Sequence, residues 1–306
     1  MTRKTCFGHR FLMGDRLYKL VTDDDESAEL SKGISNEASE EVPENFGRQV
    51  VASVASKTGD QLSKPGLILT WLLTALGAPP VTIGLLVPVR EAGALLPQIP
   101  FANLMSRSKR RKHFWVVGSL LQGASVIAIG FAALGLSGSS LGWTVVGLLV
   151  VFSLARALCS LSYKDLVGKT IPKTRRGRLS GLASSISGWV AVAVGVFFAL
   201  NKAEELPVAV FTGMLFAAGL LWWVGAWLMS RVIEYASQTN GGSDIVSEIK
   251  ESLALLKEDP VFFRFCIARG LLASTVLSMP FYVVLAHEST GGRIRSLGLQ
   301  IGRAHV

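Results

Sequence analysis

Long apolar stretches separated by short polar turns organise this chain. A transmembrane helix needs about 20 mostly apolar residues. Seven stretches approach or exceed that length: about 50–76, 81–105, 114–135, 141–163, 179–200, 207–230 and 261–286. The third to the sixth are near-continuous apolar runs with glycine and alanine at intervals, which is typical of helices that pack closely in a membrane. The pattern predicts an all-α, polytopic membrane protein.

The first span allows two registers. Residues 65–86 form a cleaner apolar run than 50–76, but a helix over 65–86 encloses Pro79 and Pro80 and leaves no residues for a turn before the second span. A helix that ends near Leu76, a turn through residues 77–80 and a new helix from Val81 place the prolines where helices tolerate them. We favour this second register and keep the first as the alternative.

The composition argues against a soluble enzyme and excludes disorder for most of the chain. Only 17% of the 306 residues are charged and the mean hydropathy is +0.43, whereas a soluble domain carries about 25% charged residues. The glycine-rich stretches follow no predicted strand, so they are not phosphate loops. The three cysteines, Cys6, Cys159 and Cys266, fit no metal or disulfide spacing. We therefore expect no enzymatic activity, no metal site and no cofactor.

The N-terminal segment differs from the rest of the chain in charge. Residues 1–46 contain 6 Lys/Arg and 10 Asp/Glu, whereas residues 47–306 contain 25 and 12. No apolar core of a secretory signal follows the basic start before Asp15. We expect residues 1–46 to form an acidic, solvated arm and residues 47–230 to form a six-span bundle.

Lysine and arginine indicate the orientation, because cytoplasmic turns carry an excess of them. The turns after the second and fourth spans are strongly basic, while those after the first and third carry no charge. Both basic turns lie on the side of the N-terminus, so we predict a cytoplasmic N-terminus in the plasma (inner) membrane. The net charge of +9 follows from this rule, and no aromatic-interleaved basic patch indicates a nucleic-acid partner.

Residues 231–260 form a charged linker between the sixth and seventh spans. A possible cap at Ser243 or Asp244 precedes apolar residues at helical spacing: Ile245, Ile249, Leu253 and Leu256. With glutamates and lysines between them, they predict an amphipathic helix on the cytoplasmic face.

The layout and two short motifs resemble the major facilitator superfamily, whose transporters have two six-helix halves. After its second span the family carries Gly-x-Leu-Ala-Asp-Arg-x-Gly-Arg-Arg-Lys. Residues 102–112, ANLMSRSKRRK, are similar, with Ser106 at the position of the aspartate. The resemblance implies a cytoplasmic gate loop containing Ser106, Arg107, Arg110 and Arg111. In the fourth span, Arg156 matches the arginine of the family's Arg-x-x-Gln-Gly element.

The resemblance also implies the architecture and the function. It implies a six-helix bundle plus a seventh span over residues 261–287, with residues 288–299 beginning a second half. The implied function is a secondary active transporter that moves a small solute by alternating access, coupled to protons, with the lipid bilayer, the solute and protons as its partners. The alternative is a non-transporting scaffold or receptor-like relative of the same fold.

The last residues are unlike the rest. Residues 301–306, IGRAHV, resemble the translation of a common sequencing adapter, so we expect residues 300–306 to be an artefact and the chain to be a truncated fragment that does not transport by itself.

Several ionisable side chains fall inside the predicted spans. Such a group at the bilayer centre costs about 2.5–3.5 kcal/mol, so it usually faces a cavity or a partner. At about 1.5 Å per residue, Asp60 and Glu91 lie near the midplane. Asp60 belongs to a stripe with Lys57, Gln61 and Lys64.

These groups suggest a polar cavity formed by Asp60, Arg90, Glu91, Gln98, Arg156 and Arg269. In this hypothesis, Asp60 or Glu91 accepts a proton, and Arg156 and Arg269 bind an anion or relay charge. The structural alternative is ion pairing alone, of Asp60 with Lys57 or Lys64 and of Glu91 with Arg90 or a neighbouring span, because ion pairs inside bundles often serve packing alone.

Overall fold

The computed structural model describes residues 39, 41–201, 206–236, 250 and 254–277. Every regular element in this part is helical: α3 (Val42–Leu62), the π-helix η2 (Pro65–Leu69), α4 (Thr70–Ala75), α5 (Pro80–Leu95), α6 (Gln98–Ser106), α7 (Lys112–Gly135), α8 (Gly138–Thr170), α9 (Lys173–Leu200), α10 (Val208–Ser230) and α12 (Pro260–Leu277). Five described stretches are long and apolar enough to cross a membrane: Pro80–Ser106, Lys112–Gly135, Gly138–Thr170, Lys173–Phe198 and Val208–Ser230. The predicted all-α, polytopic membrane protein is confirmed.

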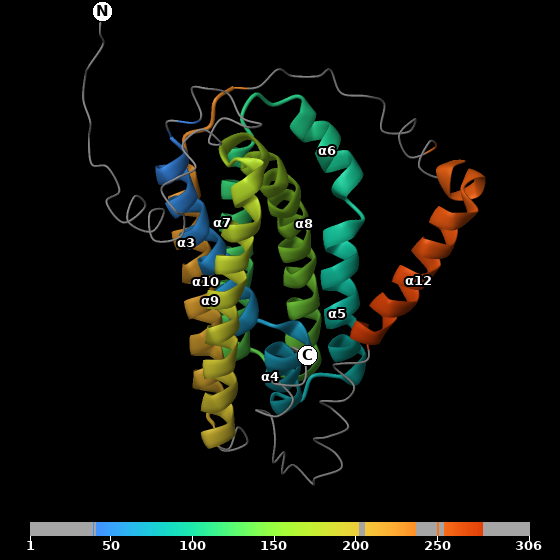
Figure 1. The fold of residues 1–306 in the computed structure, drawn as a ribbon. Helices are drawn as coiled ribbons and strands as arrows, with labels where there is room; N and C mark the ends of the chain where they lie inside the picture. Colours follow the sequence, from blue (N-terminus) through green and yellow to red (C-terminus); the bar gives the residue numbers. More distant parts are fainter. Residues whose placement is uncertain (1–38, 40, 202–205, 237–249, 251–253, 278–306) are drawn as a thin grey trace, which may run out of the picture.

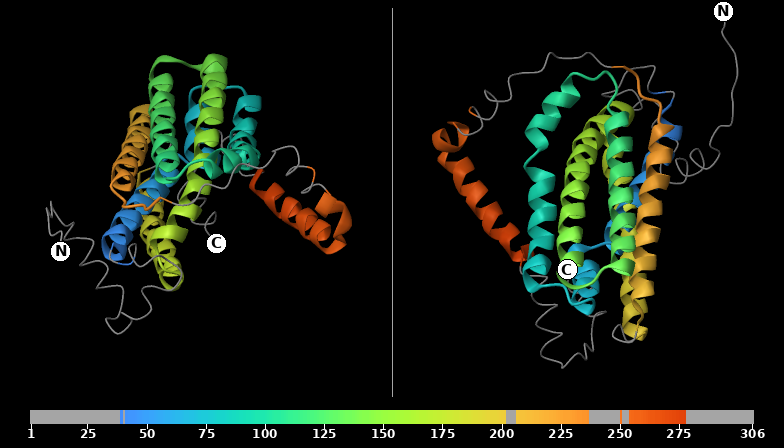
Figure 2. Two further views of the ribbon diagram at one scale, coloured as in Figure 1. Left: turned by 90° about the horizontal axis from the view of Figure 1, so that it is seen from above. Right: turned by 180° about the vertical axis from the view of Figure 1, so that it is seen from behind.

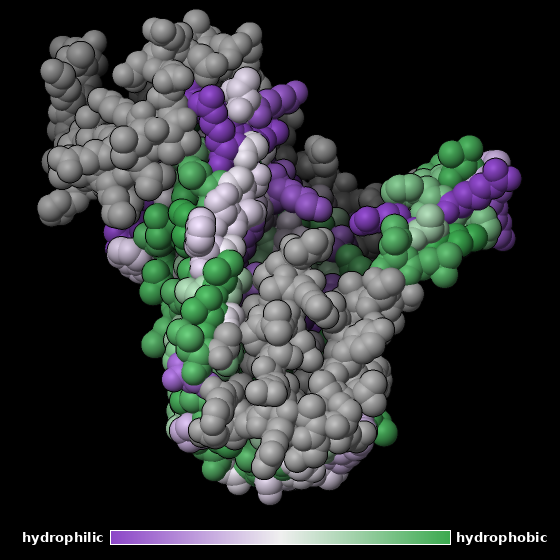
Figure 3. All heavy atoms as spheres, turned by 60° about the horizontal axis from the view of Figure 1, so that its bottom comes forward, coloured by the Kyte–Doolittle hydropathy of each residue, from purple (hydrophilic) through white to green (hydrophobic). Residues whose placement is uncertain are grey.

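The helices form a bundle with their axes running roughly along one direction (Figures 1 and 2). α7 packs between α8 and α10, α3 packs against α10 and α9, and α5 packs against α8. The largest buried cluster of apolar side chains joins these helices and includes Ile129, Phe152, Phe211 and Trp222. Large apolar side chains also remain exposed, among them Trp189. Figure 3 shows such hydrophobic surface along the flank of the bundle, as expected for helices that face lipid.

The pair α7 and α10 approaches closely at two glycines. A Cβ atom added to Gly219 would lie 2.4 Å from Ile127 Cγ1 and 2.9 Å from the carbonyl oxygen of Gly123. A Cβ atom added to Gly123 would lie 2.7 Å from the carbonyl oxygen of Gly219. Because apolar burial alone drives little association in lipid, such small-residue contacts are a main source of helix packing.

The first predicted span is not one helix, and it is not among the five described stretches long and apolar enough to cross a membrane. α3 ends at Leu62, and Ser63 and Lys64 separate it from η2 and α4. Pro65 starts η2, and its ring and missing N–H do not allow α3 to continue unbroken. The next turn agrees with the favoured register, since α4 ends at Ala75, Gly77 adopts a φ of 71°, and α5 starts at Pro80.

The second span is interrupted as well. α5 ends at Leu95 and α6 starts at Gln98, with Pro97 in between. Hydropathy predicted one continuous helix over 81–105, because an average over apolar residues does not register a single proline.

Several boundaries lie outside the apolar runs. α3 begins at Val42, and Val42 and Phe46 are completely buried, so the acidic arm, expected to reach residue 46, does not include these residues. α8 continues to Thr170, seven residues past its predicted end at 163. The end of α8 contains basic residues such as Lys169 and lies beyond the apolar segment. Hydropathy therefore does not detect this part of the helix.

α12 stands apart from the bundle and contacts α5 (Figures 1 and 2). It covers the first part of the predicted seventh span, and its remainder, residues 278–287, lies outside the described residues. The arm (1–38), most of the predicted linker helix and residues 288–306 also lie outside them, although residues 254–258 are helical.

Candidate functional site

Asp60 accepts hydrogen bonds from two arginines that come from different helices. Arg90 Nη2 of α5 lies 2.7 Å, and Arg156 Nη1 of α8 lies 2.5 Å, from the same oxygen, Asp60 Oδ1. Both contacts are also ion pairs. We call Asp60, Arg90 and Arg156, together with Lys57 and Glu91, the central cluster. The structure thus brings together four of the six residues predicted to line a cavity: Asp60, Arg90, Glu91 and Arg156.

The central cluster lies away from the ends of the apolar helix α10. Gly59, next to Asp60, packs against Trp222 of α10. At about 1.5 Å per residue, Trp222 is about 12 Å from the Ser230 end of α10 and about 21 Å from its start. Asp60 therefore lies level with the interior of α10 and not with either of its ends.

The helix break follows Asp60 within one helical turn. Ser63 and Lys64, three and four residues later, are not helical. Non-helical backbone at membrane depth is tolerated only where protein or a cavity surrounds it, and discontinuous helices often build substrate and ion sites in transporters. The helix break and the ion pairs thus both indicate a candidate site around Asp60.

Arg90 is the most enclosed member of the cluster. Its side chain is 8% exposed, and its guanidinium lies 5.3 Å from the centroid of the Phe152 ring, within the range of a cation–π interaction. Its buried Nε has no hydrogen-bond partner among the described residues. Burial, the aromatic ring and Asp60 fix this arginine in place.

Glu91 and Lys57 complete the cluster without direct ion pairs. Glu91 is exposed and interacts electrostatically with Arg90 and Arg156, but no described residue forms an ion pair with it. Lys57 interacts electrostatically with Asp60 and donates a hydrogen bond of 2.5 Å from Nζ to Ser184 Oγ of α9. The predicted local pairing of Asp60 with a stripe lysine is not the arrangement found.

Gln98 and Arg269 do not join the cluster. Gln98 Nε2 donates to the carbonyl oxygen of Ala94 at 3.0 Å, across the interruption between α5 and α6. Arg269 is exposed on α12, which contacts α5. Gln98 was predicted to line the same cavity as Glu91, but Pro97 interrupts the helix between them.

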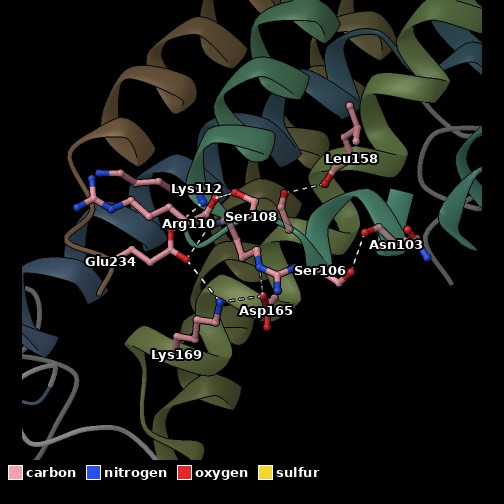
Figure 4. A network of polar contacts seen from close by, with 11 residues as sticks. Asn103, Ser106, Ser108, Arg110, Lys112, Leu158, Asp165, Lys169 and Glu234 are labelled. Atoms are coloured by element: carbon pink, nitrogen blue, oxygen red, sulfur yellow. Dashed lines mark hydrogen bonds and ion pairs between the residues drawn. The ribbon is translucent and has the colours of Figure 1, made fainter. Parts of the chain in front are cut away.

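A second polar network surrounds the start of α7 (Figure 4). Glu234, four residues past α10, is buried and accepts hydrogen bonds from the backbone N–H of Arg111 at 2.8 and 2.9 Å and from that of Lys112 at 2.9 Å. A carboxylate there satisfies free amide groups and is favoured by the helix dipole. We call Arg111, Lys112, Asp165, Lys169 and Glu234 the α7 network.

The α7 network links α7, α8 and the segment after α10. Lys169 Nζ lies 3.1 Å from Asp165 Oδ2 and 3.7 Å from Glu234 Oε1. Arg111 Nε lies 3.2 Å from Asp165 Oδ2, and Lys112 Nζ donates to the carbonyl oxygens of residues 230 and 232 at 3.0 and 2.9 Å.

α3 holds the same segment after α10. Asn45 Nδ2 donates to the carbonyl oxygen of Ile233 at 3.0 Å, and Asn45 Oδ1 accepts from the N–H of Ile233 at 2.9 Å. Arg48 donates to the carbonyl oxygen of Arg231. These bonds fix the first residues of the linker to the bundle.

The predicted gate residues have different positions. Ser106 Oγ donates to the carbonyl oxygen of Asn103 at 2.7 Å, which satisfies a carbonyl near the end of α6 but forms no ion pair. Arg107 and Arg110 are exposed. Arg111 alone of the four belongs to the α7 network.

Sequence reasoning missed Asp165, Lys169 and Glu234 as partners of the gate loop. A signal exists for Glu234, because it is a carboxylate four residues past an apolar span, on the side that carries the basic turns. Its partner could not be chosen among so many basic residues without the fold.

Comparison with known proteins identifies the family. A family model described as Major Facilitator Superfamily matches residues 50–302, which is most of the chain. The chain belongs to the major facilitator superfamily. The central cluster and the α7 network are thus features of a major facilitator protein.

Curated relatives of this major facilitator protein include Uncharacterized protein Rv2209 of Mycobacterium tuberculosis and Uncharacterized protein Mb2232 of Mycobacterium bovis. Each is 25% identical over 272 residues, which cover 84% of this chain and 51% of the relative. The chain thus spans about half the length of the curated relatives it matches. No solved structure matches it significantly.

Proposed function

We propose that this protein is a secondary active transporter that moves a small solute across the membrane by alternating access, coupled to protons, with the central cluster as its binding and coupling site. The observation that supports this proposal is the pair of ion pairs that Asp60 makes with Arg90 and Arg156. Charges at this depth are costly, and in membrane proteins they mark substrate and ion pathways.

Proton coupling is assigned to Glu91. Asp60 shares its charge with two arginines, whereas Glu91 forms no ion pair among the described residues and is exposed beside them. A carboxylate without a fixed counter-ion can change protonation without breaking an ion pair. Glu91 is therefore the better group to load and release a proton, while Asp60 keeps the arginines in position.

The α7 network is assigned to the gate, on the cytoplasmic side of a plasma-membrane protein whose N-terminus is cytoplasmic. Arg111, Lys169 and Glu234 connect two membrane helices and the linker by contacts that a small displacement of α7 against α8 breaks. Such a network stabilises one state of an alternating-access cycle without preventing the other.

Uptake by proteoliposomes tests the proposal. The 306-residue chain and the longest open reading frame that contains it are reconstituted separately, and a stable-isotope-labelled cell extract is supplied outside with and without a pH gradient. We expect a solute to accumulate only with the gradient, and Glu91→Gln to abolish accumulation while preserving exchange of bound solute, because a permanently neutral side chain mimics the loaded state.

The negative outcome favours the alternative function. If neither protein accumulates any solute beyond the level in protein-free vesicles, transport is contradicted and a membrane scaffold or receptor-like role takes its place. Ser106 is the observation that favours the alternative, since a serine at the family's aspartate position forms a hydrogen bond but no ion pair.

A further inference from the structure

The charges around Asp60 do not balance. Lys57 interacts electrostatically with Asp60, Lys64 with Arg90, and Arg90 and Arg156 with both Asp60 and Glu91. The central cluster and Lys64 together therefore contain four cations and two carboxylates, an excess of two positive charges. An uncompensated charge in a low-dielectric environment is strongly unfavourable.

No other described carboxylate supplies the missing negative charge. Glu41 and Glu44 lie at the start of α3, and Glu44 pairs with Arg48. Asp165 and Glu234 belong to the α7 network, and Asp165 is about 13 Å from Arg156 along α8. The two others, Glu258 and Asp259, directly precede α12.

Arg156 has hydrogen-bond donors without an acceptor among the described residues. It donates to Asp60 through Nη1, and among the described residues nothing accepts a hydrogen bond from its Nη2 or Nε. Its side chain is 35% exposed, against 8% for Arg90. A guanidinium edge of this kind binds the two oxygens of a carboxylate or phosphate group in a bidentate manner.

We propose that the central cluster binds a small anionic solute, a carboxylate or phosphate compound, on the free edge of the Arg156 guanidinium, with Lys57 as the second cation of the site. The anion supplies the negative charge that the described residues lack. Asp60 holds Arg156 from the opposite edge, so the guanidinium is oriented before the anion arrives and loses little conformational entropy on binding.

Binding to the 306-residue chain in detergent tests this inference independently of transport, although the solute's movement across the membrane rests on the proposed function. A cell extract is divided by ion exchange into anionic, cationic and neutral fractions, and the melting temperature of the protein is measured with each. We expect only the anionic fraction to raise it. Succinate and inorganic phosphate, added singly, then distinguish a carboxylate from a phosphate ligand.

Variants assign the effect to Arg156. Arg156→Gln leaves Asp60 paired with Arg90, so the protein still folds, and the stabilisation by the anionic fraction should disappear. Arg156→Lys keeps the charge but loses the fork, so the apparent affinity should fall by about tenfold or more, as for the loss of a charge-assisted hydrogen bond. Arg264→Gln, on exposed α12, serves as the matched control and should respond like the unmodified protein.

Three results overturn the inference: stabilisation by the cationic or neutral fraction alone, stabilisation by no fraction, or a shift that survives in Arg156→Gln. The failures of the two proposals are distinguishable. Uptake of a cationic solute contradicts the proposal that the ligand is an anion and leaves the proposal of transport standing. Anion binding without any uptake contradicts transport and leaves the proposed anion site standing.

Discussion

Asp60 and Arg156 are 96 positions apart in the chain, yet Arg156 Nη1 donates to Asp60 Oδ1 over 2.5 Å. The contact joins the end of α3 to the middle of α8, two helices that are also joined by hydrogen bonds of Gln49 with Thr170 and of Ser53 with Tyr163. Arg90 of α5 donates to the same oxygen. One carboxylate oxygen thus joins three helices.

Removal of the Asp60 charge should destabilise the bundle. Asp60→Asn leaves two neighbouring arginines without their shared counter-ion. Breaking a fully buried ion pair in this way costs about 3–5 kcal/mol, which is the upper bound for these partly buried pairs. Unfolding in detergent micelles measures the loss. Glu258→Gln, at an exposed carboxylate outside the central cluster, should change the free energy of unfolding by less than about 0.5 kcal/mol.

A double variant separates charge from packing. Asp60→Asn leaves both Arg90 and Arg156 without a counter-ion, whereas Asp60→Asn combined with Arg156→Gln leaves only Arg90 unpaired. The double variant should therefore regain part of the stability that Asp60→Asn loses. If the double variant is as unstable as the sum of the two single variants, the residues do not interact energetically.

Glu234 should stabilise the start of α7. Glu234→Ala removes the acceptor of two backbone amides and a partner of Lys169, and each amide left without a partner costs about 1–3 kcal/mol. We expect a lower melting temperature and faster hydrogen exchange at Arg111 and Lys112. Glu258→Ala, at an exposed carboxylate, is the control, and equal effects of the two variants would contradict the role of Glu234.

The close contact between α7 and α10 depends on the absence of a Cβ atom at Gly219. In Gly219→Ala, the added Cβ meets Ile127 and the backbone of Gly123, and overpacking of this kind costs about 1–3 kcal/mol. Gly213 lies in the same helix with nothing within 4 Å of an added Cβ. Gly213→Ala should therefore keep or raise the melting temperature, since alanine is the better helix former. A Gly219→Ala protein as stable as Gly213→Ala would show that the helices do not approach so closely.

The proposed topology is tested by labelling. Single cysteines at Ser108 and Ser139, introduced into a chain whose native cysteines are replaced, flank α7, which is long enough to cross the membrane. A membrane-impermeant thiol reagent should label Ser139→Cys in intact cells and Ser108→Cys only after permeabilisation. Labelling of both from the outside would mean that α7 does not separate them.

The sequence by itself determined the helical class and the four central spans. The predicted ranges 114–135, 141–163, 179–200 and 207–230 correspond to α7, α8, α9 and α10. They could be predicted because burial in lipid requires apolar residues along a whole helix, which is a local property. The turn before α5 was predicted for the same reason, since proline acts on its own neighbours.

The tertiary structure decided what the charged residues do. Sequence placed Asp60, Arg90 and Arg156 inside the membrane, but spacing along one helix offered Lys57 or Lys64 as partners of Asp60, and only the packing of α3, α5 and α8 brought two arginines to one oxygen. The tertiary structure likewise placed Glu234 against the backbone amides at the start of α7 and left Arg269 exposed on α12. Hydropathy reports how each residue interacts with its solvent, whereas an ion pair between distant segments depends on how the helices pack.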